Sequence, residues 1–181
     1  MNGSLEGRST GGPNSNRPKA RRAGPDDAAE LTRLRAVMFA AMGQDEHNGW
    51  QRACEADLRV LLAGSTTAAF VVDAPDGWGL ASGVVGTLDR RLPGPHRPAR
   101  QSVVGHVSSM ATDPRWRRRG LARTALEALL DWFAEHGAAS VTLNATPEGE
   151  PLYRSLGFSR PPNPALRLTL QPAVSAEPPP R

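Results

Sequence analysis

The sequence predicts a single α/β domain, and three observations support this. The 181 residues are enough for one hydrophobic core and short for two. Apolar, strand-like runs bounded by turn residues recur through the middle of the chain. The last long run precedes a strongly amphipathic stretch and a further strand, and a right-handed crossover in this order makes two neighbouring parallel strands.

Two helices are expected before the strands. Acidic residues after Pro25 favour a helix start, and apolar residues then recur at helical spacing as far as Gly43. A second helix is predicted from about Asn48 to Leu62, after a polar loop at Gln44–Gly49. The apolar residues at helical spacing on the first helix are Leu31, Leu34, Val37, Met38 and Met42. One face of the second helix is expected to carry Trp50, Cys54, Leu58 and Leu61 or Leu62.

Strands are predicted at Thr66–Asp73, Leu80–Asp89 and Ser102–Thr112. The segment Leu92–Arg100 contains three prolines and shows no periodicity, so it is expected to be a loop. The following helix is predicted at about Arg118–His136 and is stopped by Gly137. Its apolar stripe consists of Leu121, Ala125, Ala128, Leu129, Trp132 and Phe133, and the next strand is predicted at Ala139–Ala145.

Composition indicates polar tails around the domain. Residues 1–20 and 171–181 have little apolar content and are expected to be disordered. Residues 1–22 hold five basic residues and one acidic residue, a net charge of +4 that equals the excess of the whole chain. The rest of the chain is therefore balanced in charge, which argues against a nucleic-acid-binding protein.

The single cysteine, Cys54, excludes an internal disulfide and a cysteine-cluster metal site, and it is expected to be buried. No apolar stretch approaches the roughly 20 residues that cross a bilayer, and the N-terminus lacks the apolar core of a signal peptide. We therefore expect a soluble, cytoplasmic protein that does not bind membranes.

The segment Asp113–Ala122 is the most informative part of the chain. It joins a strand to a helix, and the first amides of a helix attract anions such as a pyrophosphate. Gly120 removes a side chain that would hold a phosphate away, and arginines at 115, 117, 118, 119 and 123 supply positive charge. The segment has neither the Gly-Lys-Ser/Thr of a P-loop nor a G-x-G-x-x-G motif.

The pattern Arg117-x-x-Gly120-x-Ala122 resembles the acetyl-coenzyme A signature, Gln/Arg-x-x-Gly-x-Gly/Ala, of the GNAT acetyltransferase superfamily. Leu-Tyr-x-x-Leu-Gly-Phe at 152–158 is similar to the family's closing motif, and Arg21–Leu34 to its first strand and helix. The resemblance implies one GNAT-like domain at 21–170. Its sheet would be mixed and mostly antiparallel, with a parallel pair at the cofactor cleft and about four flanking helices.

The resemblance also implies the function, an N-acetyltransferase that moves an acetyl group from acetyl-coenzyme A to a primary amine of a small molecule or peptide. Transfer would be direct, in a ternary complex, and would need no metal. The implied catalytic groups are the Tyr153 phenol, as general acid, and the Met110 amide, as a donor to the thioester carbonyl. The residues implied to contact coenzyme A are Met110, Ala111, Thr112, Arg117, Arg118, Arg119, Gly120, Leu121, Ala122, Arg123 and Asn144.

The general base stays open among Glu46, His47, His106 and a water chain. The family often has asparagine seven positions before the closing tyrosine, where this chain has Thr146, so Asn144 is taken to face the cofactor instead. Relatives often dimerise, which makes a homodimer compatible with the resemblance. The alternative function is a non-catalytic module that binds acyl-coenzyme A as a regulatory ligand.

Overall fold

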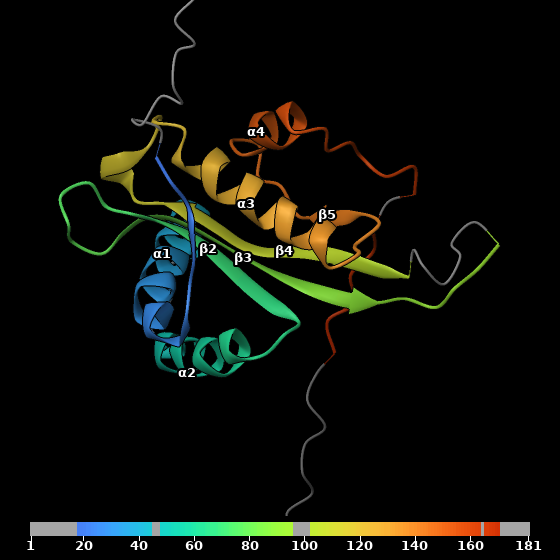
Figure 1. Ribbon diagram of the computed structural model, residues 1–181, viewed down its shortest axis with the longest axis horizontal. Helices are drawn as coiled ribbons and strands as arrows, with labels where there is room; N and C mark the ends of the chain where they lie inside the picture. Colours follow the sequence, from blue (N-terminus) through green and yellow to red (C-terminus); the bar gives the residue numbers. More distant parts are fainter. Residues whose placement is uncertain (1–17, 45–47, 96–101, 164, 171–181) are drawn as a thin grey trace, which may run out of the picture. The chain divides into compact units, whose positions relative to one another are not determined.

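The computed structural model describes residues 18–44, 48–95, 102–163 and 165–170 (Figure 1). The chain forms two compact units, Met1–Asn144 and Ala145–Arg181. The tails predicted at 1–20 and 171–181 lie outside the described residues, except for residues 18–20.

The first unit contains a five-stranded sheet in the order β1-β2-β3-β4-β5. Neighbouring strands are antiparallel except β4 and β5, which are parallel. The strands are β1 (Arg21–Arg22), β2 (Thr67–Asp73), β3 (Leu80–Arg90), β4 (Val103–Thr112) and β5 (Val141–Leu143). The mixed, mostly antiparallel sheet with one parallel pair is thus confirmed.

Helices cover both faces of this sheet. Helices α1 (Ala28–Ala41) and α2 (Trp50–Ala63) lie on one face and α3 (Leu121–Glu135) on the other (Figure 1). Short 3-10 turns precede α1 at Pro25–Asp27 and α3 at Pro114–Trp116. The fourth helix, α4 (Glu150–Ser155), belongs to the second unit.

The start of α3 is the clearest correction to the predicted boundaries. The helix was expected from about Arg118 but begins at Leu121. Arg118 and Gly120 have φ values of 63° and 78°, in the left-handed region, which a right-handed helix cannot include. The final strand is also shorter than predicted, because only Val141–Leu143 pair with β4.

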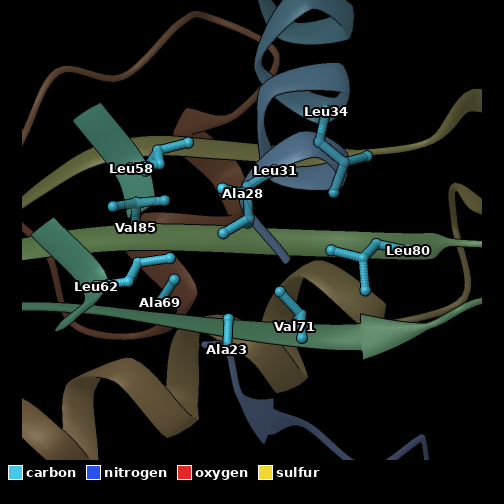
Figure 2. Close-up of a cluster of buried hydrophobic side chains, with 10 residues drawn as sticks. All are labelled: Ala23, Ala28, Leu31, Leu34, Leu58, Leu62, Ala69, Val71, Leu80 and Val85. Carbon is cyan, nitrogen blue, oxygen red and sulfur yellow. The ribbon is translucent and has the colours of Figure 1, made fainter. Parts of the chain in front are cut away.

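One hydrophobic core lies between the sheet and helices α1 and α2 (Figure 2). Leu31 and Leu34 of α1 reach so close to the sheet that a Cβ at Gly83 would lie 3.0 and 3.2 Å from them. Met42, the last of the helically spaced apolar residues of the first predicted helix, is 38% exposed, and of the two leucines considered for the buried face of α2, Leu61 is 45% exposed. Met42 follows the last residue of α1, and Leu62 rather than Leu61 continues the buried row of α2.

The other face of the sheet packs on α3. Leu126, Leu129 and Phe133 are fully buried, and the ring of Phe133 lies directly over the backbone of β3 and β4. A Cβ at Gly105 would lie 2.9 Å from three atoms of that ring, so glycine is required for the helix to approach this closely.

Gly105→Ala should therefore lower the free energy of unfolding by about 1–3 kcal/mol, the usual cost of overpacking a core. Urea denaturation of the two proteins measures the change. Gly94→Ala is the matched control, because a Cβ there meets nothing within 4 Å. Equal losses in both variants would contradict the role given to the contact between Gly105 and Phe133.

Candidate functional site

The candidate site begins where β4 extends beyond β5, its parallel neighbour. β5 pairs with β4 only from Gly105 to Val107, whereas β3 pairs with β4 from Val103 to Thr112 with a break at Ser108. Among the described residues, Ser109–Thr112 therefore have a strand partner on one side alone. Its other side presents backbone amides and carbonyls that an extended ligand can pair with.

A β-bulge decides which backbone groups face that side. Ser108 has no Cα partner on β3, since Val85 pairs with Ser109 and Gly86 with Val107. Beyond the bulge, the Asp113 amide donates to the Ala81 carbonyl at 2.9 Å. Backbone groups alternate along an antiparallel strand, so the amides of Met110 and Thr112 face away from β3. The Met110 N–H thus lies on the open side of β4.

A buried carboxylate fixes the end of β4. Asp113 is 4% exposed and accepts the Arg115 amide at 3.0 Å, which closes the turn into the 3-10 segment. The guanidinium groups of Arg115 and Arg33 donate to the same carboxylate at 3.1 and 2.9 Å. These hydrogen bonds, Arg115 first, lower the pKa of Asp113 from 3.8 to about 2.

Helix α1 is tied to the same place. The Arg33 guanidinium also donates to the Leu80 carbonyl at 2.8 Å and to the Glu30 carboxylate at 2.9 Å. Glu30 in turn accepts the Leu80 amide at 2.8 Å. One network of hydrogen bonds thus joins α1, the start of β3 and the end of β4, and it sets the direction of the chain that leaves Asp113.

The loop before α3 has an unusual backbone. Arg118 and Gly120 are left-handed, and Gly120 is the N-cap of the helix. Glycine adopts this conformation without strain, whereas for Arg118 it is uncommon. Thr124 is the first residue whose amide bonds within the helix, to Gly120 O at 3.1 Å. The amides of Leu121 and Ala122 precede it, at the positive end of a 15-residue helix dipole.

The loop arginines have different surroundings. Arg117 Nε donates to the Thr112 carbonyl at 3.3 Å, which connects the loop to the last residue of β4. The Arg119 guanidinium stacks on the Trp116 ring, 4.8 Å from its centroid. Both side chains are held near the helix N-terminus, and both are exposed.

Two further arginines are engaged with carboxylates. Arg123 donates to Glu127 on the surface of α3 at 3.3 Å, and Arg115 is paired with Asp113 as described above. From the sequence, the arginines at 115, 117, 118, 119 and 123 were expected to supply positive charge together. The structure instead places Arg117, Arg118 and Arg119 on the exposed loop, where their charge faces solvent.

The second unit holds Tyr153 on α4. Its residue exposure is 9%, and its ring meets Phe158 edge-on with centroids 5.9 Å apart. Gly149 permits close packing here, because a Cβ there would lie 3.2 Å from the Tyr153 ring. Burial raises the pKa of the Tyr153 phenol above its usual value of 10, so the group stays protonated at neutral pH.

The other residues singled out in the sequence lie in different parts of the chain. His106 Nδ1 lies 3.1 Å from Thr142 Oγ1, across the pairing of β4 with β5. Glu46 and His47 lie outside the described residues. Asn144 is exposed at the end of the first unit. Cys54 is only partly buried and packs beside the core of α1 and α2.

No three His, Cys, Asp or Glu side chains of the described residues are grouped so that they could hold a metal ion. No helix in the described part of the chain is both long enough and apolar enough to cross a membrane.

Sequence reasoning missed three features of this region. They are the buried state of Asp113, the stacking of Arg119 on Trp116, and an arginine of α1 at the bulge, Arg35. An aspartate before proline indicates a turn, and nothing in that local signal shows that the carboxylate will be buried or that Arg33, 80 residues away, will bind it.

Comparison with known proteins shows a matching family model and similar folds. Residues 85–166 match the family model of the acetyltransferase (GNAT) domain. A GCN5-related N-acetyltransferase from Ralstonia eutropha JMP134 is 26% identical with a TM-score of 0.71, over 83% of this chain and 97% of that one. The search of curated proteins found no match.

Two structures with bound ligands share the fold at lower identity. A predicted acetyltransferase from Clostridium acetobutylicum with acetyl-CoA is 18% identical, with a TM-score of 0.73 over 83% of this chain and 95% of that one. An aminoglycoside N-acetyltransferase in complex with CoA is 17% identical, with a TM-score of 0.66 over 83% and 93%.

The buried carboxylate predicts a pH dependence of stability. Because folding lowers the pKa of Asp113 from 3.8 to about 2, its contribution is complete above about pH 4 and is lost as the pH falls toward 2. Asp113→Asn should lower the free energy of unfolding by on the order of 2 kcal/mol at pH 7. Chemical denaturation should show that the difference in free energy of unfolding between the variant and the native protein becomes smaller between pH 4 and pH 2.

Asp131→Asn, an exposed carboxylate on α3, is the control and should change stability by less than about 0.5 kcal/mol. A deficit of Asp113→Asn that stays constant down to pH 2 would show that the charge of Asp113 does not stabilise the fold.

Proposed function

We propose that the chain is an acetyltransferase of the GNAT superfamily, which its match to the GNAT domain model over residues 85–166 supports, and that it transfers an acetyl group from acetyl-coenzyme A to a primary amine of a small molecule or peptide. Transfer is direct, in a ternary complex, and residues 21–170 form the acetyltransferase domain. One observation carries the proposal: β4 continues past β5 with an open side and leads through Asp113 into a helix N-terminus capped by Gly120.

The diphosphate of coenzyme A suits the N-terminus of α3. The amides of Leu121 and Ala122 belong to the first turn, where backbone N–H groups lack intrahelical partners, and the helix dipole adds a partial positive charge. No side chain at Gly120 holds a phosphate at a distance. Arg117, Arg118 and Arg119 add charge on the exposed loop, while Leu121, 4% exposed, contributes its amide alone.

The pantetheine arm suits the open side of β4. It carries two amides at a spacing that can pair with an extended strand. In our proposal it pairs with the backbone of Met110–Thr112, for which no side chain is needed. The side chains of Met110 and Ala111 are then left to packing, and Asn144 contacts the cofactor from the end of the first unit.

The acetyl thioester supplies an activated carbonyl, so the chain has to align groups rather than generate a nucleophile. The neutral amine of the acceptor attacks the carbonyl carbon, forming the C–N bond while the C–S bond breaks. The Met110 N–H donates to the oxygen on which negative charge develops, an effect of about 10²–10³ in rate in comparable sites. The departing thiolate takes the phenolic proton of Tyr153.

The acceptor nitrogen loses one proton in the same reaction, and the tyrosinate regains one. Glu46, His47, His106 or water performs the first of these transfers. His106 is the candidate with a described partner, since its ring contacts Thr142. Tyr153 enters the reaction protonated, because burial raises its pKa.

The test of this function is thiol release from acetyl-coenzyme A across a panel of primary amines, with amine-free controls. We expect release that depends on one class of amine and falls about 10²–10⁴-fold in kcat in Tyr153→Phe, with little change in KM, since only a proton donor is removed. Binding of acetyl-coenzyme A without release for any amine would favour the non-catalytic module. Full activity of Tyr153→Phe would exclude the phenol as general acid.

Gly120→Glu should abolish acetyl-coenzyme A binding, because it puts bulk and negative charge at the proposed diphosphate site. Calorimetric titration measures the loss. Gly137→Glu is the matched control, since Gly137 has the same left-handed backbone (φ of 76° against 78°) and lies at the opposite end of α3. A Cβ meets nothing within 4 Å at either glycine, and the left-handed backbone strains a glutamate at both, so the two variants should lose stability to a similar extent. Equal affinities in the two variants would refute the site.

A further inference from the structure

Arg35 occupies an unexpected place beside the proposed site. Its guanidinium donates to the Ser108 carbonyl at 3.3 Å, at the β4 residue that the bulge removes from the ladder with β3. The same guanidinium stacks on the Phe39 ring, 4.8 Å from the centroid. Stacking on a ring and a hydrogen bond together restrict the position of a long side chain.

The surroundings of Arg35 are aromatic and apolar. Phe39 of α1 meets Trp50 of α2 edge-on, with centroids 5.3 Å apart and planes at 86°. Ser109 Oγ lies 3.8 Å from the Met38 sulfur. All of these side chains are only partly buried, so the ends of α1 and α2 offer an accessible aromatic surface at β4.

The distance to the proposed reaction centre is short. Ser108 and Met110 are two residues apart on one strand, which corresponds to about 7 Å. The Met110 amide is the proposed donor to the thioester carbonyl. A small acceptor whose amine attacks that carbonyl therefore lies within reach of the Arg35 guanidinium.

The charge of Arg35 is available to a ligand. No carboxylate among the described residues forms an ion pair with it, whereas Arg33 and Arg59 both have acidic partners. Within the described part of the chain, α1 carries no acidic residue after Glu30, which is itself paired with Arg33. A guanidinium with four remaining N–H donors beside an aromatic surface suits a planar carboxylate.

We propose that Arg35 binds a carboxylate of the acceptor, and that the acceptor is an amino acid with an apolar or aromatic side chain. This inference rests on the proposed function and names its substrate class. Phe39 and Trp50 contact the side chain of the acceptor, and Arg35 its carboxylate, which leaves the amine directed at the thioester. A polycationic acceptor is disfavoured, because Arg35 repels it at the same place.

The test compares three acceptors in the thiol-release assay: L-phenylalanine, L-phenylalaninamide and spermidine. The amide keeps the amine and the ring but lacks the carboxylate. We expect kcat/KM for L-phenylalanine to exceed that for the other two at least about 10-fold. Arg35→Met should remove this preference by raising KM for L-phenylalanine about 10- to 100-fold, with KM for the amide unchanged.

Two further variants isolate the charge at this position. Arg35→Lys should recover part of the preference, since it restores a cation without the planar fork. Arg52→Met, an exposed arginine of α2, is the matched control and should behave as the native protein. Thermal unfolding and acetyl-coenzyme A affinity are measured for each variant, so that a folding defect is recognised.

The proposal is overturned if the native protein prefers the amide or spermidine, or if Arg35→Met lowers activity equally for L-phenylalanine and its amide. Failure of the proposed function is distinguishable, because it gives no thiol release with any amine. In that case calorimetric titration of L-phenylalanine into the protein saturated with coenzyme A still decides. Binding that Arg35→Met weakens at least 10-fold supports the carboxylate site, and absent or unchanged binding refutes it.

Discussion

The buried carboxylate of Asp113 is the constraint on which the geometry of this site depends. It lies at the end of β4, where the chain must leave the sheet, and it is almost fully removed from solvent. A carboxylate in that position is stable only if donors surround it. Arg115 comes from the turn itself and Arg33 from α1, so satisfying one charge fixes three segments relative to one another. The end of β4 and the turn that leads to α3 are thereby held in fixed positions relative to each other.

The sheet supplies the second constraint through unequal pairing. β4 pairs with β3 on both sides of the bulge, but with β5 at only three residues. An open strand side is ordinarily a liability, because unpaired amides and carbonyls invite association with other chains. Here the open side is short, and it ends beside exposed arginines and a helix N-terminus. A ligand with amides at one end and phosphates at the other fits both features, which is why we propose this edge of the sheet as the coenzyme A site.

The sequence allowed the elements to be predicted more accurately than the contacts between them. Hydrophobic periodicity depends on which residues are apolar, so the strands and helices of the first unit were located within a few residues. The start of α3 was misplaced by three residues, because a left-handed arginine at 118 has no signature in composition. The Met110 amide followed from the family resemblance, and the bulge at Ser108 gives a physical reason why it faces the open side. The contact of Asp113 with Arg33 and that of Arg35 with the Ser108 carbonyl were beyond prediction, since each joins segments about 70 to 80 residues apart.

The arginines show how one residue type takes several roles in this fold. Of 22 basic residues in the chain only Lys19 is a lysine, and the structure uses the planarity of the guanidinium repeatedly. Arg33 bridges two carboxylates and a carbonyl, and Arg119 and Arg35 stack on aromatic rings. Of these three arginines, Arg35 lies beside the open part of β4 and Arg119 on the loop that follows it, and neither is paired with a carboxylate among the described residues. A cation near the acceptor disfavours the ammonium form of an amine beside it. If Arg35 holds the acceptor by its carboxylate, the same guanidinium that binds the substrate also favours the neutral, nucleophilic state that acetyl transfer requires.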